Sequence, residues 1–186
     1  MSEAEIASRI LHSIILAGCV SPNNDWVDLD KLWVSPETFE SFSDLLAEYL
    51  SKFRERTSFN KIVAPNKVYG PFGILPIAAV YSAKAKIPLI IWKEWAKPAT
   101  GGSLFFGSVN DGDKLLILHD VVSYGATVVK EKEDLLAYAR GKKCEIVGIL
   151  TVVVHEQKGI DFINERAKIP VKAIVSWEEL VKHFKQ

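Results

Sequence analysis

A short run of polar and small residues has the types and spacing expected of a phosphate site. The run ends the stretch "KLLILHDVVSYGAT", residues 114–127. We expect a buried strand, then Asp120, then a tight turn that enters a helix. Backbone N–H groups at a helix N-terminus bind phosphate well, and Ser123 and Thr127 add hydroxyls. Gly125 can adopt backbone angles closed to other residues. The turn therefore predicts a phosphate seat; a helix cap beside a solvated Asp is the alternative.

The acidic residue of this run is expected to serve a different partner, because a carboxylate repels phosphate. Asp120 is suited to accept a hydrogen bond from a sugar hydroxyl or to bind Mg²⁺ through water. A second strand-to-helix turn, "APNKVYGP" (64–71), offers Asn66 and Lys67. Ligands of parallel α/β sheets bind at the carboxyl ends of strands. The two turns are therefore predicted to share one site.

The elements that must position these residues follow from the apolar pattern. Buried strands are expected at 59–65, 87–94, 114–120, 144–154 and 171–175, with a further strand, alone or as half of a hairpin, at 103–109. Helices are expected at 3–18, from Ser35-Pro36 onward, and at 72–85, 126–140, 160–167 and 177–185. Strands alternate with helices, which predicts an α/β fold with a central, mainly parallel sheet flanked by helices.

Composition excludes several functions. The chain has 186 residues, and its 23 basic and 23 acidic residues cancel, so no broad nucleic-acid or membrane-binding surface is implied. The start lacks a secretory signal, and no apolar run approaches the roughly 18 residues of a membrane span. Cys19 and Cys144 lie far apart and are expected to be buried thiols, and the histidines lack ligand spacing. We expect a cytoplasmic protein without nucleic-acid or membrane partners and without a protein-held metal cage.

The stretch "LLILHDVVSYGAT" resembles the 5-phosphoribosyl-1-pyrophosphate (PRPP) motif of type I phosphoribosyltransferases. That motif has four apolar residues, two acids, two apolar residues, then Thr-Thr-Gly-x-Thr/Ser. The residues that keep the pattern after the apolar strand are Asp120, Val121, Val122, Gly125 and Thr127. Ser123 replaces the first Thr conservatively, His119 replaces the first acid, and Tyr124 replaces the second Thr.

The resemblance extends over most of the chain and is nearest to the orotate phosphoribosyltransferase branch. "IVAPNKVYGPFGILPIAAV" is similar to that branch's pyrophosphate loop and following helix. "IIWKEWAKPATGGSLFFGSV" is similar to its strand, mobile loop and Gly-Gly pair. Residues 1–57 fall where the branch has its hood. We therefore expect one phosphoribosyltransferase-like domain over 1–186, with a small N-terminal hood at 1–57 and an α/β core at 58–186.

The resemblance implies an enzyme that transfers the phosphoribosyl group of PRPP to a nucleobase and releases pyrophosphate. It implies Mg²⁺, bridging pyrophosphate and ribose oxygens with few protein ligands, and a homodimer. Lys93 and Lys97 would reach over the pyrophosphate from the mobile loop, Asn66 and Lys67 would bind it from the first loop, and Asp120 would hold the ribose. The 5′-phosphate would bind to Ser123, Tyr124, Gly125, Ala126 and Thr127.

The base pocket departs most from that branch. "VHEQKG" places His155 where the branch has an Arg for the orotate carboxylate, and neither His nor Lys158 reproduces a bidentate guanidinium. Pro98-Ala99 stands where the mobile loop usually carries a His. Trp26 and His155 are the base-binding candidates, and the base is orotate or another one. Trp33, Phe105 and Phe106 are candidates for apolar interface area.

Two other functions stay open. A non-catalytic PRPP- or nucleotide-binding regulatory member of the same fold is favoured by the departures. A DNA-binding regulator is disfavoured, because no helix-turn-helix or net positive charge is present. His119 is either a satisfied histidine at a strand end or a hydroxyl partner, and Tyr124 either covers the phosphate or fills its seat. Surface lysines are the alternative for Lys67, Lys93 and Lys97.

Overall fold

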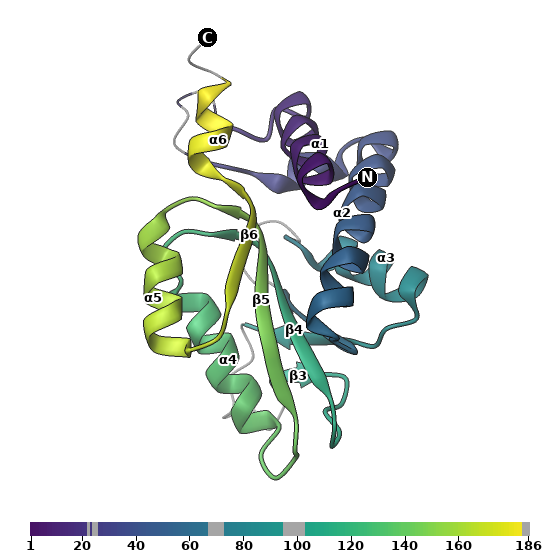
Figure 1. The fold of residues 1–186 in the computed structure, drawn as a ribbon, viewed down its shortest axis with the longest axis vertical. Coiled ribbons are helices and arrows are strands. Elements are labelled where there is room, and N and C mark those ends of the chain that lie inside the picture. The colour runs from purple at the N-terminus through teal and green to yellow at the C-terminus, as the bar shows by residue number, and fades with distance from the viewer. Residues whose placement is uncertain (22, 24–25, 67–72, 95–102, 184–186) are drawn as a thin grey trace.

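The computed structural model describes residues 1–21, 23, 26–66, 73–94 and 103–183 (Figure 1). Its helices are α1 (Glu3–Leu16), the 3-10 helix η1 (Leu29–Trp33), α2 (Pro36–Thr57), α3 (Leu75–Ala85), α4 (Ala126–Tyr138), α5 (Gln157–Ala167) and α6 (Trp177–Lys182). Its strands are β1 (Lys61–Asn66), β2 (Leu89–Lys93), β3 (Phe105–Phe106), β4 (Lys114–Val122), β5 (Glu145–Val154) and β6 (Val171–Ser176).

The six strands form one sheet in the order β3-β2-β1-β4-β5-β6. Among the described residues the pairings are parallel except that of β3 with β2, where Ile91 lies opposite Phe106. The predicted α/β fold with a mainly parallel sheet is therefore confirmed. The strand order reverses between β1 and β4, and such a switch point opens a crevice at the carboxyl ends of the two strands.

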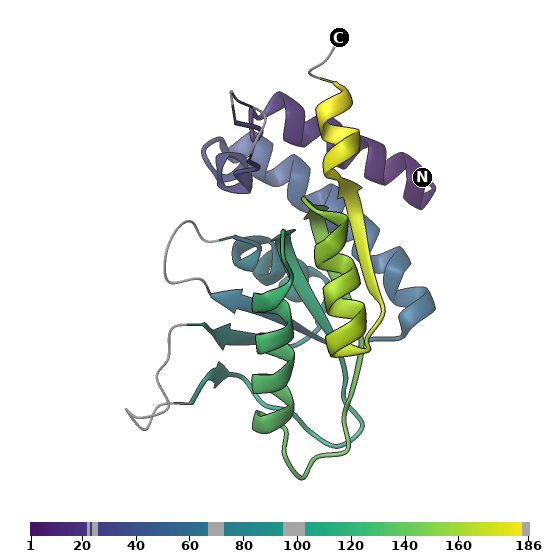
Figure 2. The same ribbon diagram turned by 90° about the vertical axis from the view of Figure 1, so that its left-hand side faces the viewer.

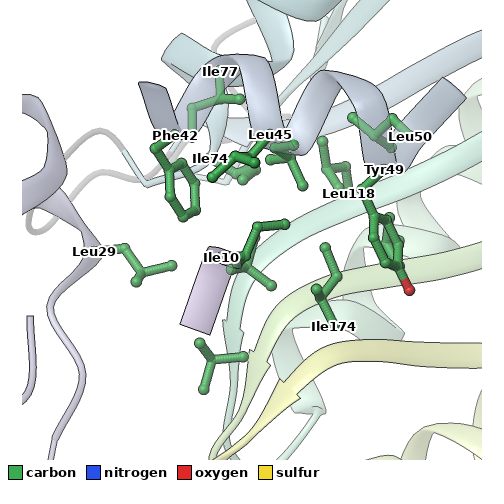
Figure 3. Packing of buried hydrophobic residues seen from close by; sticks show 14 of the residues in the cluster. Ile10, Leu29, Phe42, Leu45, Tyr49, Leu50, Ile74, Ile77, Leu118 and Ile174 are labelled. Carbon is green, nitrogen blue, oxygen red and sulfur yellow. The ribbon is translucent and has the colours of Figure 1, made fainter. Parts of the chain in front are cut away.

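Alternation along the strands divides the buried side chains between two faces. Leu116 and Leu118 of β4 point to the face covered by α1, α2 and α3, whereas Leu115 and Ile117 point to the face covered by α4 and α5. Both views show this three-layer arrangement (Figures 1 and 2). Apolar residues of helices and sheet meet on the first face, as Figure 3 shows for Ile10 beside Leu118 and Ile174.

The helix boundaries follow from local chemistry. Ser35 caps α2 by accepting from the N–H of Thr38, and Pro36 occupies the first turn, where its missing N–H costs nothing. Ser176 forms a capping box with Glu179 at α6. Both starts match the predicted ones. Because α5 begins at Gln157, the helix expected at 160–167 starts three residues earlier.

Several local expectations need correction. The strand expected at 103–109 is only Phe105–Phe106, and Phe105 is buried in this chain's own core, where it stacks on Tyr138, so it offers no interface area. Cys144 is only half-buried, because it precedes the first residue of β5. Trp33 packs edge-on against Phe39, within the chain's own helices.

Polar contacts tie the N-terminal segment (residues 1–57) to the core at several places, of which two lie far apart. Asp30 Oδ1 accepts hydrogen bonds from Trp33 Nε1 (2.9 Å) and from the N–H of Gly73 (3.1 Å), just before α3. Lys172 of β6 pairs with Glu3 of α1 at 3.5 Å. Within the described residues, no helix is long and apolar enough to cross a membrane.

Candidate functional site

A cavity of about 640 Å³ lies at the carboxyl end of β4, at the switch in strand order. Its described lining comes from three segments: residues 26–30, Glu94 after β2, and residues 119–128. The first of these belongs to the N-terminal segment, so the cavity lies between that segment and the core. The predicted phosphate turn and Trp26 are thus brought together in one site.

The phosphate seat is the N-terminus of α4. Gly125 is the N-cap with φ +80°, and among the described residues no side chain caps this helix end. The first turn, Ala126–Val128, is uncharged in sequence. Its N–H groups and the positive end of the helix dipole are therefore available to an anion. Ser123 and Thr127 also line the cavity, as the sequence predicts.

Gly125 is required for a second reason that the sequence does not show. A Cβ built on it would lie 2.7 Å from the carbonyl oxygen of Gly159 and 2.7 Å from Ile163 Cγ1. A Cβ on Gly159, in the first turn of α5, would lie 1.9 Å from the carbonyl oxygen of Ser123. The turn and α5 thus touch backbone to backbone, and this contact sets the position of the seat.

Asp120 is 6% exposed and lies on the strand beside His119, with its side chain on the opposite face of the sheet. Thr151 of β5 donates to the Asp120 carbonyl at 3.2 Å, which anchors the strand end. Burial raises the pKa of Asp30, and the charges of Asp28 and Asp120 add to that rise; Asp30 and Asp120 both line the cavity. The retained acid of the motif therefore faces the N-terminal segment.

His119 has a buried hydrogen-bond partner, and its second interpretation, as a sugar-hydroxyl partner, stays a prediction. Its Nε2 lies 2.5 Å from Glu131 Oε2 on α4, and the two side chains are 3% and 0% exposed. Burial raises the pKa of the Glu131 carboxyl, and the His119 contact opposes that rise. Yet His119 also lines the cavity, so the pair connects the site to the interior of α4.

Tyr124 does not fill the phosphate seat with its ring. The residue is 64% exposed, and Lys158 Nζ lies 4.8 Å from the ring centroid. Lys158 also pairs with Glu156 at 2.5 Å. These contacts hold the ring toward the start of α5.

An aromatic group stands beside the cavity. The rings of Trp26 and His155 are 6.4 Å apart, and those of His155 and Trp177 are 4.4 Å apart. Trp26 is 54% exposed and lines the cavity, whereas His155 is half-buried and does not belong to the described lining. The sequence analysis did not identify Trp177 as a residue near the site, because its position directly after Ser176 indicated only the start of a helix. The two base-binding candidates are thus adjacent, with the Trp26 face available for stacking.

The lysine candidates have different outcomes. Lys93 is the last residue of β2, not part of a loop, is 9% exposed, and lies with Nζ 4.4 Å from the centre of the Phe106 ring. Asn66 ends β1 opposite Lys93. Neither belongs to the described cavity lining. Lys67 and Lys97 lie outside the described residues, so their roles stay predictions.

Sequence reasoning missed most of the acids that line the cavity: Asp28, Asp30 and Glu94 join Asp120. Burial raises the pKa of Asp30, while the donors Trp33 and Gly73 lower it. For Asp28 and Asp30, the sequence signal that could have identified them is the stretch "DWVDLDKL", where polar residues alternate with apolar ones. Within the described part of the chain, no three His, Cys, Asp or Glu residues are grouped to hold a metal ion.

Comparison with known proteins gives the class. No family model matches the chain. The sequence is 25% identical over 163 residues to an orotate phosphoribosyltransferase of Pyrococcus horikoshii, covering 82% of each chain. The UMP synthase of Leishmania donovani superposes with a TM-score of 0.74 and 24% identity; the match covers all of this chain and 38% of that one. An orotate phosphoribosyltransferase of Mycobacterium tuberculosis, solved with PRPP, gives 0.63 and 16%, over 96% of this chain and 90% of that one.

The fold is that of the type I phosphoribosyltransferases. Within that class, the sequence is similar to the orotate phosphoribosyltransferases. The predicted resemblance is thereby confirmed.

Proposed function

We propose that the chain is an orotate phosphoribosyltransferase-like enzyme, which transfers the phosphoribosyl group of PRPP to a nucleobase in pyrimidine nucleotide synthesis. The main observation in support is the N-terminus of α4, which no described side chain caps and which lies at the carboxyl end of β4. It belongs to one cavity that Asp120 and Trp26 also line. One cavity would thus supply an anion seat, a sugar-binding acid and an aromatic face to a single substrate. Relatives that bear the name of the enzyme support the assignment.

The chain's own residues would act by binding and orientation. The N–H groups of the α4 N-terminus, with Ser123 and Thr127, would hold the 5′-phosphate. Asp120 would accept hydrogen bonds from the ribose hydroxyls, and Trp26 would stack on the base. Held in this way, the base nitrogen faces the anomeric carbon and the reaction becomes effectively intramolecular. The carboxylates nearby would stabilise positive charge that develops on the ribose.

Magnesium fits the site as a partner of the substrate. Asp28, Asp30, Glu94 and Asp120 supply the oxygen donors that Mg²⁺ prefers, without a three-residue cluster among the described residues. Asp120 and Asp30 would contact an ion held mainly by PRPP oxygens and water. Such an ion would neutralise charge on the departing pyrophosphate.

The experiment is calorimetric titration of the protein with PRPP and Mg²⁺, followed by a pyrophosphate-release assay. We expect micromolar binding and release with at least one base from a panel of orotate, uracil and other pyrimidines and purines. Binding without release for any base would favour the non-catalytic regulatory member of the fold instead. Absence of PRPP binding would overturn both.

A homodimer belongs to the same proposal. Phe106 is 58% exposed on the edge strand β3 and is the one of the three predicted interface residues that offers apolar area to a partner. Sedimentation equilibrium of the same preparation would give twice the chain mass of 20.7 kDa.

A further inference from the structure

The buried pair of His119 and Glu131 has features that a packing role leaves unexplained. The buried residues of α4 are Val128, Glu131 and Leu135, spaced three and four apart. Glu131 therefore occupies the apolar stripe that faces the sheet, where a leucine would be expected. A carboxylate there loses its hydration and gains one close partner. Replacing such a pair by apolar residues of similar volume is often neutral or stabilising, so stability alone does not account for it.

We infer that Glu131 is a positioning residue that orients His119 toward the sugar of the bound phosphoribosyl donor, an inference that rests on the proposed function. His119 is both a member of the buried pair and a residue of the cavity lining. The same cavity is lined by Asp120 and by Glu94, which follows β2. His119 precedes Asp120 and the turn along β4, where the sugar of a donor whose phosphate is bound at α4 would lie.

The geometry determines which ring nitrogen meets the ligand. An ionised carboxylate only accepts, so with Glu131 ionised the hydrogen of the 2.5 Å contact lies on Nε2 and is donated to Glu131 Oε2. In the neutral ring this leaves Nδ1 without a proton, as an acceptor for a sugar hydroxyl. In that tautomer the pair would offer a hydrogen-bond acceptor at the cavity without placing a second carboxylate against the ligand.

The surroundings of Glu131 explain why its partner matters. Glu94 after β2 and Asp134 one turn along α4 both raise the pKa of Glu131, in addition to burial, and His119 lowers it. Asp134 itself is occupied by Trp92 Nε1 (3.1 Å) and Lys130 Nζ (2.6 Å). Glu131 Oε1 is buried with no hydrogen-bond partner in the described part of the chain. His119 is thus the hydrogen-bond partner that the strand supplies to this acidic surface.

The test compares Glu131→Gln with Glu133→Gln. Both remove one negative charge from α4, but Glu133 is exposed and two residues away. The first readout is the ¹⁵N NMR spectrum of the histidine rings of the wild-type protein, which distinguishes the two tautomers. The second is PRPP–Mg²⁺ affinity by calorimetry, and the third is the pH profile of the pyrophosphate-release assay.

We expect the wild-type His119 to carry its proton on Nε2 and Glu131→Gln to change the ¹⁵N shifts of that ring. PRPP binding should weaken on the order of tenfold, as when carboxylates that orient metal-binding histidines are removed, and the pH profile should shift. Glu133→Gln should leave all three unchanged. The inference is overturned by a wild-type ring protonated only on Nδ1, a result that needs no variant to fold. Equal PRPP affinity and pH profile in the two variants would overturn it as well. Absence of PRPP binding by the wild type would instead refute the proposed function.

Discussion

At the scale of single residues, the cavity combines an anion seat with carboxylates that are costly to bury. Asp30 shows this balance clearly. Its Oδ1 accepts from Trp33 and Gly73, while Oδ2 is buried without a hydrogen-bond partner among the described residues. Burial raises its pKa above the ordinary value of 3.8. The folded protein therefore binds this proton more tightly than the unfolded chain does.

A pH-dependent stability difference follows for Asp30→Asn. The stability linked to the Asp30 proton is fully present below about pH 4, the unfolded pKa, and is lost as the pH rises through the higher folded value. The Asn amide oxygen keeps both hydrogen bonds but does not ionise. Urea unfolding should therefore show the variant gaining stability relative to wild type between about pH 4 and pH 7. Asp161→Asn, an exposed carboxyl on α5, is the control; an equal slope in both variants would contradict the prediction.

The residues of the seat could be predicted because their signal is local. Ser123, Gly125 and Thr127 are contiguous, and their small size and hydroxyls identify them without a structure. The partner of His119 could not be predicted. In the sequence Glu131 is one of several charged residues on a helix, and only the packing of α4 against β4 shows that it contacts His119. Lys93 lies in the strand expected at 87–94, but the contact of its Nζ with the Phe106 ring could not be predicted, because that contact depends on how β3 pairs with β2.

At the scale of elements, the contact between the phosphate turn and α5 sets where the seat lies. The strands and helices themselves were predictable from apolar periods and capping residues, since those are properties of short segments. The approach of Gly125 to Gly159 was not, because it joins two elements through the backbone rather than through side chains. This contact therefore offers a way to displace the seat without touching a ligand-binding group.

Gly159→Ala should disturb both stability and binding. The new Cβ would lie 1.9 Å from the Ser123 carbonyl oxygen, so the turn or α5 must move. We expect a loss of about 1–3 kcal/mol in the free energy of unfolding, measured with urea, and weaker PRPP binding. Gly148→Ala is the matched control, because its Cβ would meet only ordinary contacts, the nearest at 3.5 Å. A Gly159→Ala protein that behaves like the Gly148→Ala protein would show that the contact is dispensable.

At the scale of the whole molecule, the N-terminal segment and the α/β core share one apolar cluster. Ile10 of α1, Leu46 of α2, Leu118 of β4 and Ile174 of β6 all belong to it. We propose on this ground that residues 1–186 fold as one domain. The cavity also needs both parts to pack together, because residues 26–30 belong to the N-terminal segment and residues 119–128 to the α/β core.

Unfolding should accordingly be a single transition. Ile10→Ala should cost about 2–5 kcal/mol, because the site is fully buried, and should lower the stability of the sheet as well as of α1. Far-UV circular dichroism and tryptophan fluorescence should report the same midpoint in wild type and variant. Leu16→Ala, at a 73% exposed position of the same helix, should change stability by less than about 0.5 kcal/mol. Two separate transitions would contradict the single-domain proposal.

The buried pair of His119 and Glu131 also constrains the mutational history of the chain. A glutamate that enters the apolar stripe of α4 before a histidine faces it would be an unpaired buried charge, which costs about 3–5 kcal/mol. A histidine at 119 without Glu131 meets no such penalty, because a neutral imidazole is tolerated in a strand end. The substitution at 119 is thus expected to have come first or together with the one at 131. Homologues with an acid at 119 should accordingly carry an apolar residue at 131.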